Sequence, residues 1–589
     1  PSSTSSTSTS TSFSLVNTDY TLKEISKYND DFSIQRLGWL GGDIATSVPL
    51  PSFPSSSSSS SKTPSSTQTV DKQPSHLLWL FGDSIIGISN PDRRVKSFSS
   101  FISNTVGIST FDSHEQKREI ETEKNEKENE EGKEGKEKID SNEYRNIKQM
   151  KYYWGDDSEG LPEPIFKLKQ TDMLHLCKGD NKNSDISVWP ITGISVLNDD
   201  GDDKNPDKQD KQDTDYQLVI VASIACRYHE IIPTAHAPSR HRLLDEAEEE
   251  EEEEEENMMK ENNDHTNNYY QHFHSEENKD NDSLNKENKK DMNQAPGAHP
   301  QFDFEEIANA VFVVSNPKDD PKIWSYEYKL VPHYGDQLHN HMLRWISVVD
   351  SNGSAFSEQS KGSIYILGTY QPKRIENIPY GGGYQVLMKI SCKELLKLNF
   401  NKLQILSSMT LNQIQNQNQL QNNHDNEIKI NEQWLTLTSD TSDVDKAVAV
   451  KDIIIPKELY QPITTEASLV KYKNKWIVAS LRFIDRYLQI CETYHIESEN
   501  WKCFNVEFDG QSSTVDSTSK NSFDIINYAA KVHLSMSTVL SNKEEDKDRD
   551  DKLNFVVSVM SNTLSGPELL FEPELKHIYT PRFYSLESM

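Results

Sequence analysis

The apolar positions of the chain fall mostly in short runs of about five to eight residues. These runs are rich in β-branched and aromatic side chains and are bounded by Gly, Asn, Asp and Ser. The pattern is typical of β-strands, and amphipathic helix periodicity is nearly absent, since only residues 392–398 resemble a helical turn. Strands are predicted at 13–20, 38–50, 77–88, 101–108, 186–197, 217–226, 310–315, 342–349, 363–370, 384–390, 466–472, 475–483, 488–494, 501–508, 526–534, 554–561 and 578–584. The sequence therefore predicts an all-β protein.

The predicted strands recur in groups of about four, at intervals of roughly sixty to seventy residues once the intervening polar tracts are set aside. This repeat is typical of β-propeller blades, and about five blades are counted. We therefore predict a five-bladed β-propeller, in which the inner strands of all blades surround a central channel. We expect residues 13–20 or their neighbours to close the ring by pairing with the C-terminal blade. A large β-sandwich or two separate β-domains is the alternative.

Long polar tracts interrupt the strand pattern. Only 34% of the 589 residues are hydrophobic, and the net charge of −32 comes largely from acidic blocks that repel themselves and bury nothing. We expect residues 1–12 to be a disordered Ser/Thr tract and residues 13–589 to form a single propeller domain with disordered insertions. These insertions are predicted at about 52–75, 112–145, 198–215, 236–300, 410–430 and 541–552.

The composition also limits the partners. No basic face is visible that would bind nucleic acid, and no apolar run approaches the ~20 residues of a membrane span. The five cysteines have no metal-ligand spacing and do not indicate a disulfide scaffold, although a Cys491–Cys503 bridge stays open. We expect a monomer without a cofactor or bound metal, a calcium ion in the channel being conceivable but not indicated. The Ser/Thr tract and the first residue, which is not Met, favour a secreted protein.

Two apolar runs end in the same way. The run from Gly38 ends at Gly42-Asp43, and the run from Leu77 ends at Gly82-Asp83. A strand that reaches Gly-Asp bends there and presents a carboxylate, so two such strands side by side hold two carboxylates at one rim. The alternative is that both aspartates only terminate strands, because Asp is common in turns.

These motifs resemble a known group of propellers. The run Trp39-Leu40-Gly41-Gly42-Asp43, residues 78–87 and residues 104–108 resemble the opening blade of a propeller family recorded as a domain of unknown function. Residues 188–190, 370–388, 465–470 and 579–583 fit the same pattern in later blades. That family is similar to the five-bladed glycosidases of the arabinanase and invertase kind, which implies a carbohydrate ligand or substrate. The chain departs from those enzymes because their Asp-Pro dipeptide is here Asp43-Ile44, and their second-blade Arg-Asp-Pro has no clear match.

Glycoside hydrolysis needs a carboxyl group that protonates the leaving oxygen and a second one that acts on water or on the anomeric carbon. Glu466 is the predicted acid, because it enters an apolar strand where loss of solvent raises a carboxyl pKa. Asp43 is the predicted base, and Asp83 the third carboxylate, which would bind sugar hydroxyls or tune its neighbours. An ordinary position at a strand edge is the alternative for Glu466.

Five further residues are predicted to bind substrate. Trp154 would offer an apolar platform beside Asp156, and His533 would bind a hydroxyl from an inner strand. Arg582 would bind a carboxylate of the substrate, with pairing inside the protein as the favoured alternative. Asn104 completes this set. For His533 the alternative is a core histidine whose hydrogen bonds are satisfied, and for Trp189 we favour a core role.

Three functions remain open on the sequence alone. The first is a glycoside hydrolase that acts at the channel mouth through Asp43, Asp83 and Glu466. The second is a propeller that binds carbohydrate or protein without catalysis. The third is an interaction scaffold whose acidic and Asn/Gln-rich insertions carry the function. Convergence of the three carboxylates in one place favours the first over the second.

Overall fold

The computed structural model describes residues 20–32, 37–51, 75–89, 95–111, 147–177, 184–197, 216–228, 304–332, 334, 338, 342–357, 362–371, 384–410, 433–437, 454–457, 459, 466–481, 487–498, 500–507, 525–536, 554–563 and 579–588. The chain divides into two units, Pro1–Arg227 with Glu305–Met589, and Tyr228–Phe304. All sheets below belong essentially to the first unit. The predicted insertions lie outside the described residues except for Ser75 and Thr410, as do residues 1–12 and 13–19.

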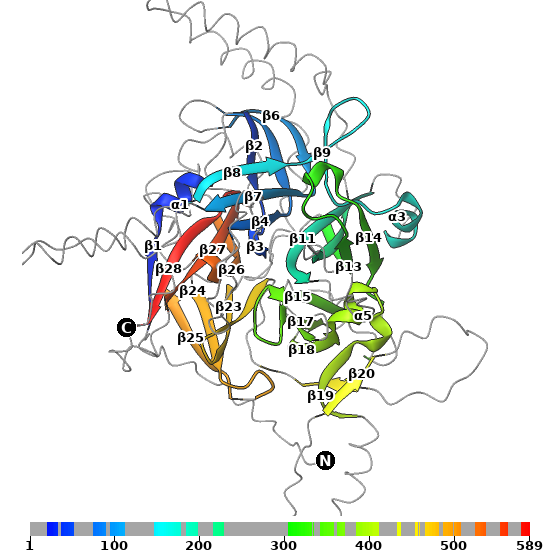
Figure 1. Ribbon diagram of the computed structural model, residues 1–589, viewed down its shortest axis with the longest axis vertical. Helices are drawn as coiled ribbons and strands as arrows, with labels where there is room; N and C mark the ends of the chain where they lie inside the picture. Colours follow the sequence, from blue (N-terminus) through cyan, green and yellow to red (C-terminus); the bar gives the residue numbers. More distant parts are fainter. Residues whose placement is uncertain are drawn as a thin grey trace, which may run out of the picture. The chain divides into compact units, whose positions relative to one another are not determined.

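The described residues are organised in sheets, with few and short helices, so the all-β prediction is confirmed (Figure 1). Two four-stranded sheets contain N-terminal residues. One has the order β3 (Thr46–Leu50), β4 (His76–Phe81), β7 (Thr105–Phe111) and β8 (Ile147–Tyr153). The other has the order β26 (Ile525–His533), β27 (Asn554–Thr563), β28 (Arg582–Ser588) and β1 (Tyr20–Glu24).

Three more sheets come from the middle of the chain. One is β11 (Ser184–Leu197), β12 (Tyr216–Tyr228), β13 (Phe304–Val314) and β14 (Tyr326–Leu330), with β16 (Phe356–Ser357) parallel to β11. The next is β15 (Met342–Asp350), β17 (Ser363–Gln371), β18 (Tyr384–Ser391), β19 (Gln404–Thr410) and β20 (Gln433–Thr436), with β21 (Ile454–Pro456) on β19. The last is β22 (Ala467–Tyr472), β23 (Lys475–Leu481), β24 (Tyr487–Thr493) and β25 (Lys502–Glu507).

The first strands of these five sheets contact one another in cyclic order. β3 contacts β11, β11 contacts β15, β15 contacts β22, β22 contacts β26, and β26 contacts β3. In Figure 1 the five sheets follow in chain order from blue through green to red. Apart from β1 in the last sheet, each of these strands is the first of its sheet in sequence, so strands that are far apart in the chain are brought side by side.

Hydrogen bonds from side chains link each of these first strands to the next. A hydroxyl or imidazole group of one strand bonds the next strand at every step, over distances of 2.7–3.3 Å. The five pairs are Thr46 Oγ1 with Ile191 O, Thr192 Oγ1 with Val348 N, Ser347 Oγ with Leu469 N, Ser468 Oγ with Val532 N, and His533 Nδ1 with Ser47 Oγ. Three of these bonds satisfy a buried backbone N–H group, those of Val348, Leu469 and Val532.

The last sheet is completed by the N-terminal strand. β1 pairs antiparallel with β28, from Tyr20 opposite Ser588 to Glu24 opposite Tyr584. Tyr20 is buried, and its hydroxyl donates to Glu492 of β24 at 3.0 Å. The prediction that a strand near residues 13–20 pairs with the C-terminal sheet is therefore confirmed for Tyr20–Glu24.

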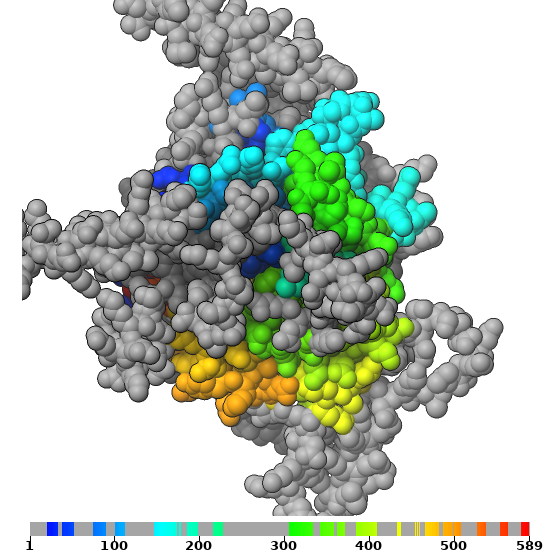
Figure 2. All heavy atoms as spheres, in the orientation of Figure 1, coloured from blue at the N-terminus to red at the C-terminus, as the bar shows by residue number. Residues whose placement is uncertain are grey.

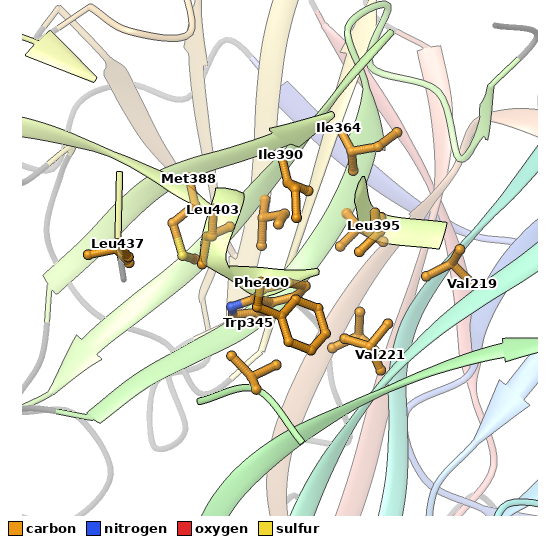
Figure 3. Close-up of a cluster of buried hydrophobic side chains, with 14 of the residues drawn as sticks. Val219, Val221, Trp345, Ile364, Met388, Ile390, Leu395, Phe400, Leu403 and Leu437 are labelled. Atoms are coloured by element: carbon orange, nitrogen blue, oxygen red, sulfur yellow. The ribbon is translucent and has the colours of Figure 1, made fainter. Parts of the chain in front are cut away.

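The sheets pack face to face through apolar side chains. In the cluster shown in Figure 3, Trp345 of β15 packs edge-on against Phe400 with ring centroids 5.6 Å apart, and Val219 and Val221 of β12 lie beside them. Leu395, from the helix α5 (Cys392–Leu396), covers the same cluster. Fully burying one such side chain contributes about 1.5–3 kcal/mol, so these contacts supply most of the attraction between neighbouring sheets.

Several local predictions need correction. The helix at 392–398 is confirmed as α5, but α1 (Ser26–Asp31) and α3 (Gln170–Leu176) were not predicted. The predicted strand 101–108 is interrupted at residues 103 and 104, between β6 (Val95–Ile102) and β7. The two helices are too short to show a helical period.

The structure has two disulfides, of which the sequence left one open, Cys491–Cys503, and did not indicate the other, Cys177–Cys226. Cys177 at the end of α3 is bonded to Cys226 of β12, and Cys491 is bonded to Cys503 across β24 and β25. The first pair is 49 residues apart, so spacing alone gave no sign of it. Cys392 is buried and free. No helix in the described part of the chain has the length and apolarity needed to cross a membrane.

Candidate functional site

The two Gly-Asp turns lie against each other. The strand pair β3–β4 continues beyond the turns as β2 (Leu37–Gly42) paired with β5 (Ser84–Ser89) in a three-stranded sheet with β6. At the bend between the two sheets, the Asp43 N–H donates to the Asp83 carbonyl at 2.9 Å, and the Gly82 N–H donates to the Asp43 carbonyl at 2.8 Å. Both aspartates therefore stand at one bend, as the sequence pattern predicts.

The bend is conformationally strained. Ile44 and Ala45 have φ values of 78° and 50°, and both are in the left-handed region that side chains with a Cβ atom rarely occupy. Such conformations cost of the order of 1–3 kcal/mol each and are found preferentially at functional sites. Ala529 and Tyr579, which lie next to Tyr528 and at the site itself, also have positive φ. Strain is therefore concentrated around Asp43.

Close packing at this bend explains the glycines before Asp43. The Gly42 N–H donates to the Tyr579 carbonyl at 2.7 Å. A Cβ atom on Gly41 would stand 2.7 Å from that carbonyl oxygen, which is closer than any real Cβ contact. The chain from the last sheet can approach the Asp43 bend only because glycine is present there.

Asp43 has the most strongly raised pKa of the three carboxyl groups of the site. Burial raises its pKa well above the ordinary range, and the neighbouring charges of Asp83 and Glu466 raise it further. A hydrogen bond from the Tyr528 hydroxyl to Asp43 Oδ1 opposes the rise, as does Arg227. These surroundings favour the protonated form of Asp43 more than those of an ordinary exposed aspartate do.

Asp83 has two partners that favour its ionised form. The Trp189 indole N–H donates to its Oδ1 at 2.7 Å, and Arg227 forms an ion pair with its Oδ2. Burial raises the pKa of Asp83, but the ion pair and the indole hydrogen bond both oppose that rise. Asp83 and Asp43 therefore differ in the groups that favour their charged forms, which are an ion pair and an indole N–H for Asp83 and a tyrosine hydroxyl for Asp43.

Glu466 stands at the start of β22, beside the buried Lys531 of β26. Burial raises the pKa of Glu466, while the positive charge of Lys531 opposes the change. Burial lowers the pKa of Lys531 to about 8, with Glu466 opposing. The Lys531 ammonium donates to the Ile191 carbonyl at 3.0 Å and to the Ala467 carbonyl at 3.3 Å, so it joins three of the first strands. Glu306 and Arg344, also close to Glu466, form their own ion pair.

The topology explains why these groups meet. Asp43, Arg344, Glu466 and Tyr528 lie at or just before the N-terminal parts of β3, β15, β22 and β26. Asp83 and Arg227 lie at the C-terminal ends of β4 and β12, which are second strands antiparallel to the first strands. Both kinds of end face the same rim of the ring of contacts. On the face seen in Figure 2, dark blue atoms of the N-terminal part are visible between cyan, green and orange segments.

Aromatic side chains border the carboxylates. Phe101, at the end of β6, is 43% exposed, which is unusual for a large apolar residue of this chain. The Arg227 guanidinium lies 5.0 Å from the centre of the Phe101 ring and 5.7 Å from that of Trp189. Tyr579 lies edge-on to Phe101 at 6.4 Å. Sequence reasoning did not select Phe101, Arg227, Tyr528 or Lys531, because single residues of these types carry no motif.

Two of the predicted binding residues are structural. Asn104 is fully buried. Its side-chain amide donates to the carbonyl groups of Phe166 at 3.0 Å and Val188 at 2.9 Å, and its Oδ1 accepts from the Phe166 N–H at 2.9 Å. His533 is 1% exposed, and its two ring nitrogens bond the hydroxyl groups of Ser47 and Ser558 at 2.7 Å each. Burial lowers the pKa of His533 to about 3, so its ring is neutral. Neither side chain is available to a ligand.

Arg582 pairs inside the protein, which was the favoured alternative. It forms an ion pair of 3.1 Å with Glu24 of β1, on the strand pair that completes the last sheet. The Arg582 guanidinium also lies over the ring of Tyr584 in β28. Its contacts among the described residues are thus with β1 and β28 and not with the carboxylates of the site. We therefore leave Arg582 out of the candidate site.

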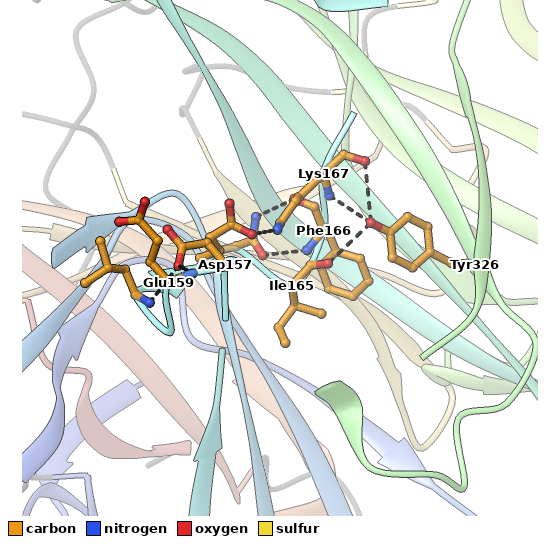
Figure 4. A network of polar contacts seen from close by, with 9 residues as sticks. Asp157, Glu159, Ile165, Phe166, Lys167 and Tyr326 are labelled. Carbon is orange, nitrogen blue, oxygen red and sulfur yellow. Dashed lines mark hydrogen bonds and ion pairs between the residues drawn. The ribbon is translucent and has the colours of Figure 1, made fainter. Parts of the chain in front are cut away.

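Trp154 and Asp156 meet at a different place. Asp156 forms an ion pair of 2.8 Å with Lys322, whose ammonium also lies 5.9 Å from the centre of the Trp154 ring. The adjacent Asp157 caps its own turn by accepting the N–H groups of Glu159 and Leu161 (Figure 4). The same figure shows Tyr326 bridging the backbone around Lys167. This group stabilises a loop, and its contacts among the described residues do not include Asp43 or Asp83.

The described residues contain no group of His, Cys, Asp and Glu side chains that would hold a metal ion. The carboxylates of the site are each opposed by a side chain of the protein: Asp83 by Arg227, Glu306 by Arg344, and Glu466 by Lys531. Asp43 has the Tyr528 hydroxyl. The charges of the site are thus balanced within the protein.

No model of a protein family matches the chain, and no curated protein matches it. One solved structure, of a candidate hydrolase from Bacteroides ovatus, aligns over 96% of this chain and 90% of its own, with 11% identity and a TM-score of 0.44. That likeness is too distant to bear on the function, which is argued below from the site.

Proposed function

We propose that this protein is a carbohydrate-active five-bladed β-propeller, and that it hydrolyses glycosides at the rim where Asp43, Asp83 and Glu466 meet. The cyclic contacts of β3, β11, β15, β22 and β26, and the hydrogen bonds that join them, support the propeller architecture. The carboxylate cluster at one end of these strands carries the functional part of the proposal. The resemblance of the opening motifs to glycosidase propellers agrees with it.

The surroundings of the carboxylates suggest their roles. Asp43, whose pKa is raised by burial and by two neighbouring carboxylates, keeps a proton and serves as the general acid. This reverses the assignment made from the sequence, where Glu466 was the acid, because Lys531 favours the ionised form of Glu466. Glu466 then acts as the base, and Asp83, held ionised by Arg227 and Trp189, stabilises positive charge on the sugar ring.

In the proposed reaction, Asp43 transfers its proton to the glycosidic oxygen. The bond between that oxygen and the anomeric carbon breaks, and its electron pair stays with the oxygen. Water attacks the anomeric carbon and gives its proton to Glu466. The products are the free sugar and the alcohol, and proton transfer back to Asp43 restores the starting state.

The test is hydrolysis of a broad panel of aryl glycosides by the wild type, by Asp43→Asn and by Glu466→Gln. General acid and base groups contribute about 10²–10⁴-fold each, so both variants should lose that much turnover while binding is kept. Asn104→Ser, which alters a structural amide, serves as a control for indirect damage. The enzyme proposal fails if the wild type turns over no member of the panel, or if both variants remain active.

A propeller that binds carbohydrate without catalysis is the second candidate. One observation favours it: both oxygens of Asp83 are already bonded by Trp189 and Arg227. A carboxylate fully engaged by the protein is typical of a binding scaffold as well as of a stabilising group. Glycan binding by the wild type without turnover of any glycoside would decide for this candidate.

A further inference from the structure

Each positive charge of the candidate site has a partner within the protein. Arg227 is paired with Asp83, and Arg344 with Glu306. The ammonium of Lys531 is buried, donates to two carbonyl groups and faces Glu466. Among the described residues of the site, no cation remains that would bind an acidic group of a ligand. His533, the nearest imidazole, is neutral and bonded on both sides.

The flat groups beside Asp83 form a stack. The planar Arg227 guanidinium lies over the rings of both Phe101 and Trp189, where cation–π attraction fixes its position. Phe101 remains 43% exposed at the edge of this stack. An exposed aromatic ring next to buried polar groups is the usual composition of a small-ligand site, where the ring binds an apolar face and the polar groups fix its orientation.

Phe101 is also tied to the carboxylates on its other side. Its ring contacts the ring of Tyr579. Burial raises the pKa of the Tyr579 hydroxyl, and the nearby charges of Asp43 and Asp83 raise that pKa further. The bond between Gly42 N and the Tyr579 carbonyl fixes this tyrosine against the Asp43 bend. The exposed ring is therefore held at a set position relative to both aspartates.

We propose that Phe101, with the Arg227 and Trp189 stack, forms a subsite for an uncharged sugar ring, and that the site selects neutral glycans over glycans with carboxylate or sulfate groups. The proposal rests on the proposed function, because it names the substrate class of the same site. A neutral sugar presents a C–H face that packs on Phe101, and hydroxyl groups that bond the carboxylates. An anionic sugar meets carboxylates without a cation to spare.

The test is calorimetric titration at pH 7 with neutral oligosaccharides, and with uronic acid and sulfated oligosaccharides of the same length. The wild type should bind neutral members at least tenfold more tightly. Phe101→Ala should weaken that binding about tenfold, the size expected of one lost aromatic contact. Tyr494→Ala, which removes an aromatic side chain that is 60% exposed on another sheet, is the control and should leave binding unchanged.

A second variant tests the charge argument directly. Asp83→Asn leaves Arg227 without its carboxylate, so affinity for the uronic acid ligands should increase while affinity for neutral ligands falls. Circular dichroism and a melting curve check that this variant folds. The inference is overturned if the wild type prefers the anionic ligands, or if Phe101→Ala and Tyr494→Ala bind alike. Absence of binding to any glycan defeats the proposed function together with it, whereas preference for anionic glycans defeats the inference alone.

Discussion

Asp43 and Asp83 are joined through their backbones: the Asp43 N–H donates to the Asp83 carbonyl, and the N–H of the preceding Gly82 donates back to the Asp43 carbonyl. The two carboxylates therefore move as one unit, and neither can leave the bend without breaking the other's turn. Only one of them, Asp83, has an ion-pair partner, Arg227. The pair thus combines a fixed geometry with unequal electrostatics, which acid–base chemistry requires.

The first prediction concerns the pH dependence of turnover. If Asp43 is the acid, the rate should be highest while Asp43 is protonated and should fall as pH rises through its pKa, which lies above the ordinary range for Asp. Tyr528→Phe removes the hydrogen bond that favours the ionised form, so the falling limb should move to higher pH. Profiles of kcat/KM against pH for both proteins measure this shift. A limb that moves to lower pH contradicts the assignment.

Asp43 should also affect stability. Its folded pKa is raised above the unfolded value, so the stability linked to it is present at low pH and is lost as pH rises through the folded pKa. The free energy of unfolding of Asp43→Asn, measured by urea titration, should therefore fall less between pH 5 and pH 8 than that of the wild type. Asp157→Asn, in an outer turn, is the matched control and should follow the wild type. Identical slopes for wild type and Asp43→Asn would speak against burial of the charge.

For His533 we expect the opposite pH dependence of the unfolding free energy. Its folded pKa of about 3 lies below the ordinary value of 6.5, so the unfolded state binds its proton first as the pH falls. Stability linked to His533 is present above pH 6.5 and is lost between pH 6.5 and 3. His533→Gln should lower the unfolding free energy at pH 8 and flatten this acid-side loss. His495→Gln, which alters an exposed histidine, should leave the curve unchanged.

The hydrogen bonds between first strands can be tested in one sheet. Ser468→Ala leaves the buried Val532 N–H without its acceptor, and we expect a loss of about 1–3 kcal/mol in unfolding free energy. Ser480→Ala in the neighbouring strand β23 is the control, because the buried hydroxyl of Ser480 has no hydrogen-bond partner within the described part of the chain. That change should be neutral or slightly stabilising. Equal losses for the two variants would remove the special role of Ser468.

Strand β1 should stabilise the last sheet. Deleting residues 1–30 removes the pairing with β28, the buried Tyr20 ring and the ion pair of Glu24 with Arg582. The melting temperature should drop by several degrees, since about 1 kcal/mol corresponds to about 2–4 °C in a domain of this size class. Deleting only residues 1–12 is the control and should cost nothing. An unchanged midpoint in the longer deletion means that β28 needs no partner.

The sequence by itself determined the strands and the two Gly-Asp turns. Alternation of β-branched and aromatic residues with turn residues is a local signal, so β11, β15 and β22 to β27 were predicted close to their observed bounds, whereas β28 begins and ends four residues later than predicted. Likewise, Gly42-Asp43 and Gly82-Asp83 end apolar runs, and that alone brought both aspartates into the candidate site. The propensity for a bend depends on adjacent residues, here Gly followed by Asp.

Tertiary structure decided everything that depends on residues distant in the chain. Arg227 meets Asp83 across 144 positions and Tyr528 meets Asp43 across 485, so no spacing in the sequence could reveal either contact. His533 and Asn104 resembled ligand-binding residues until their partners showed that they join strands. Protonation was decided in the same way, because the pKa of a carboxyl depends on burial and neighbouring charge. Those exist only once the five sheets have brought their first strands together.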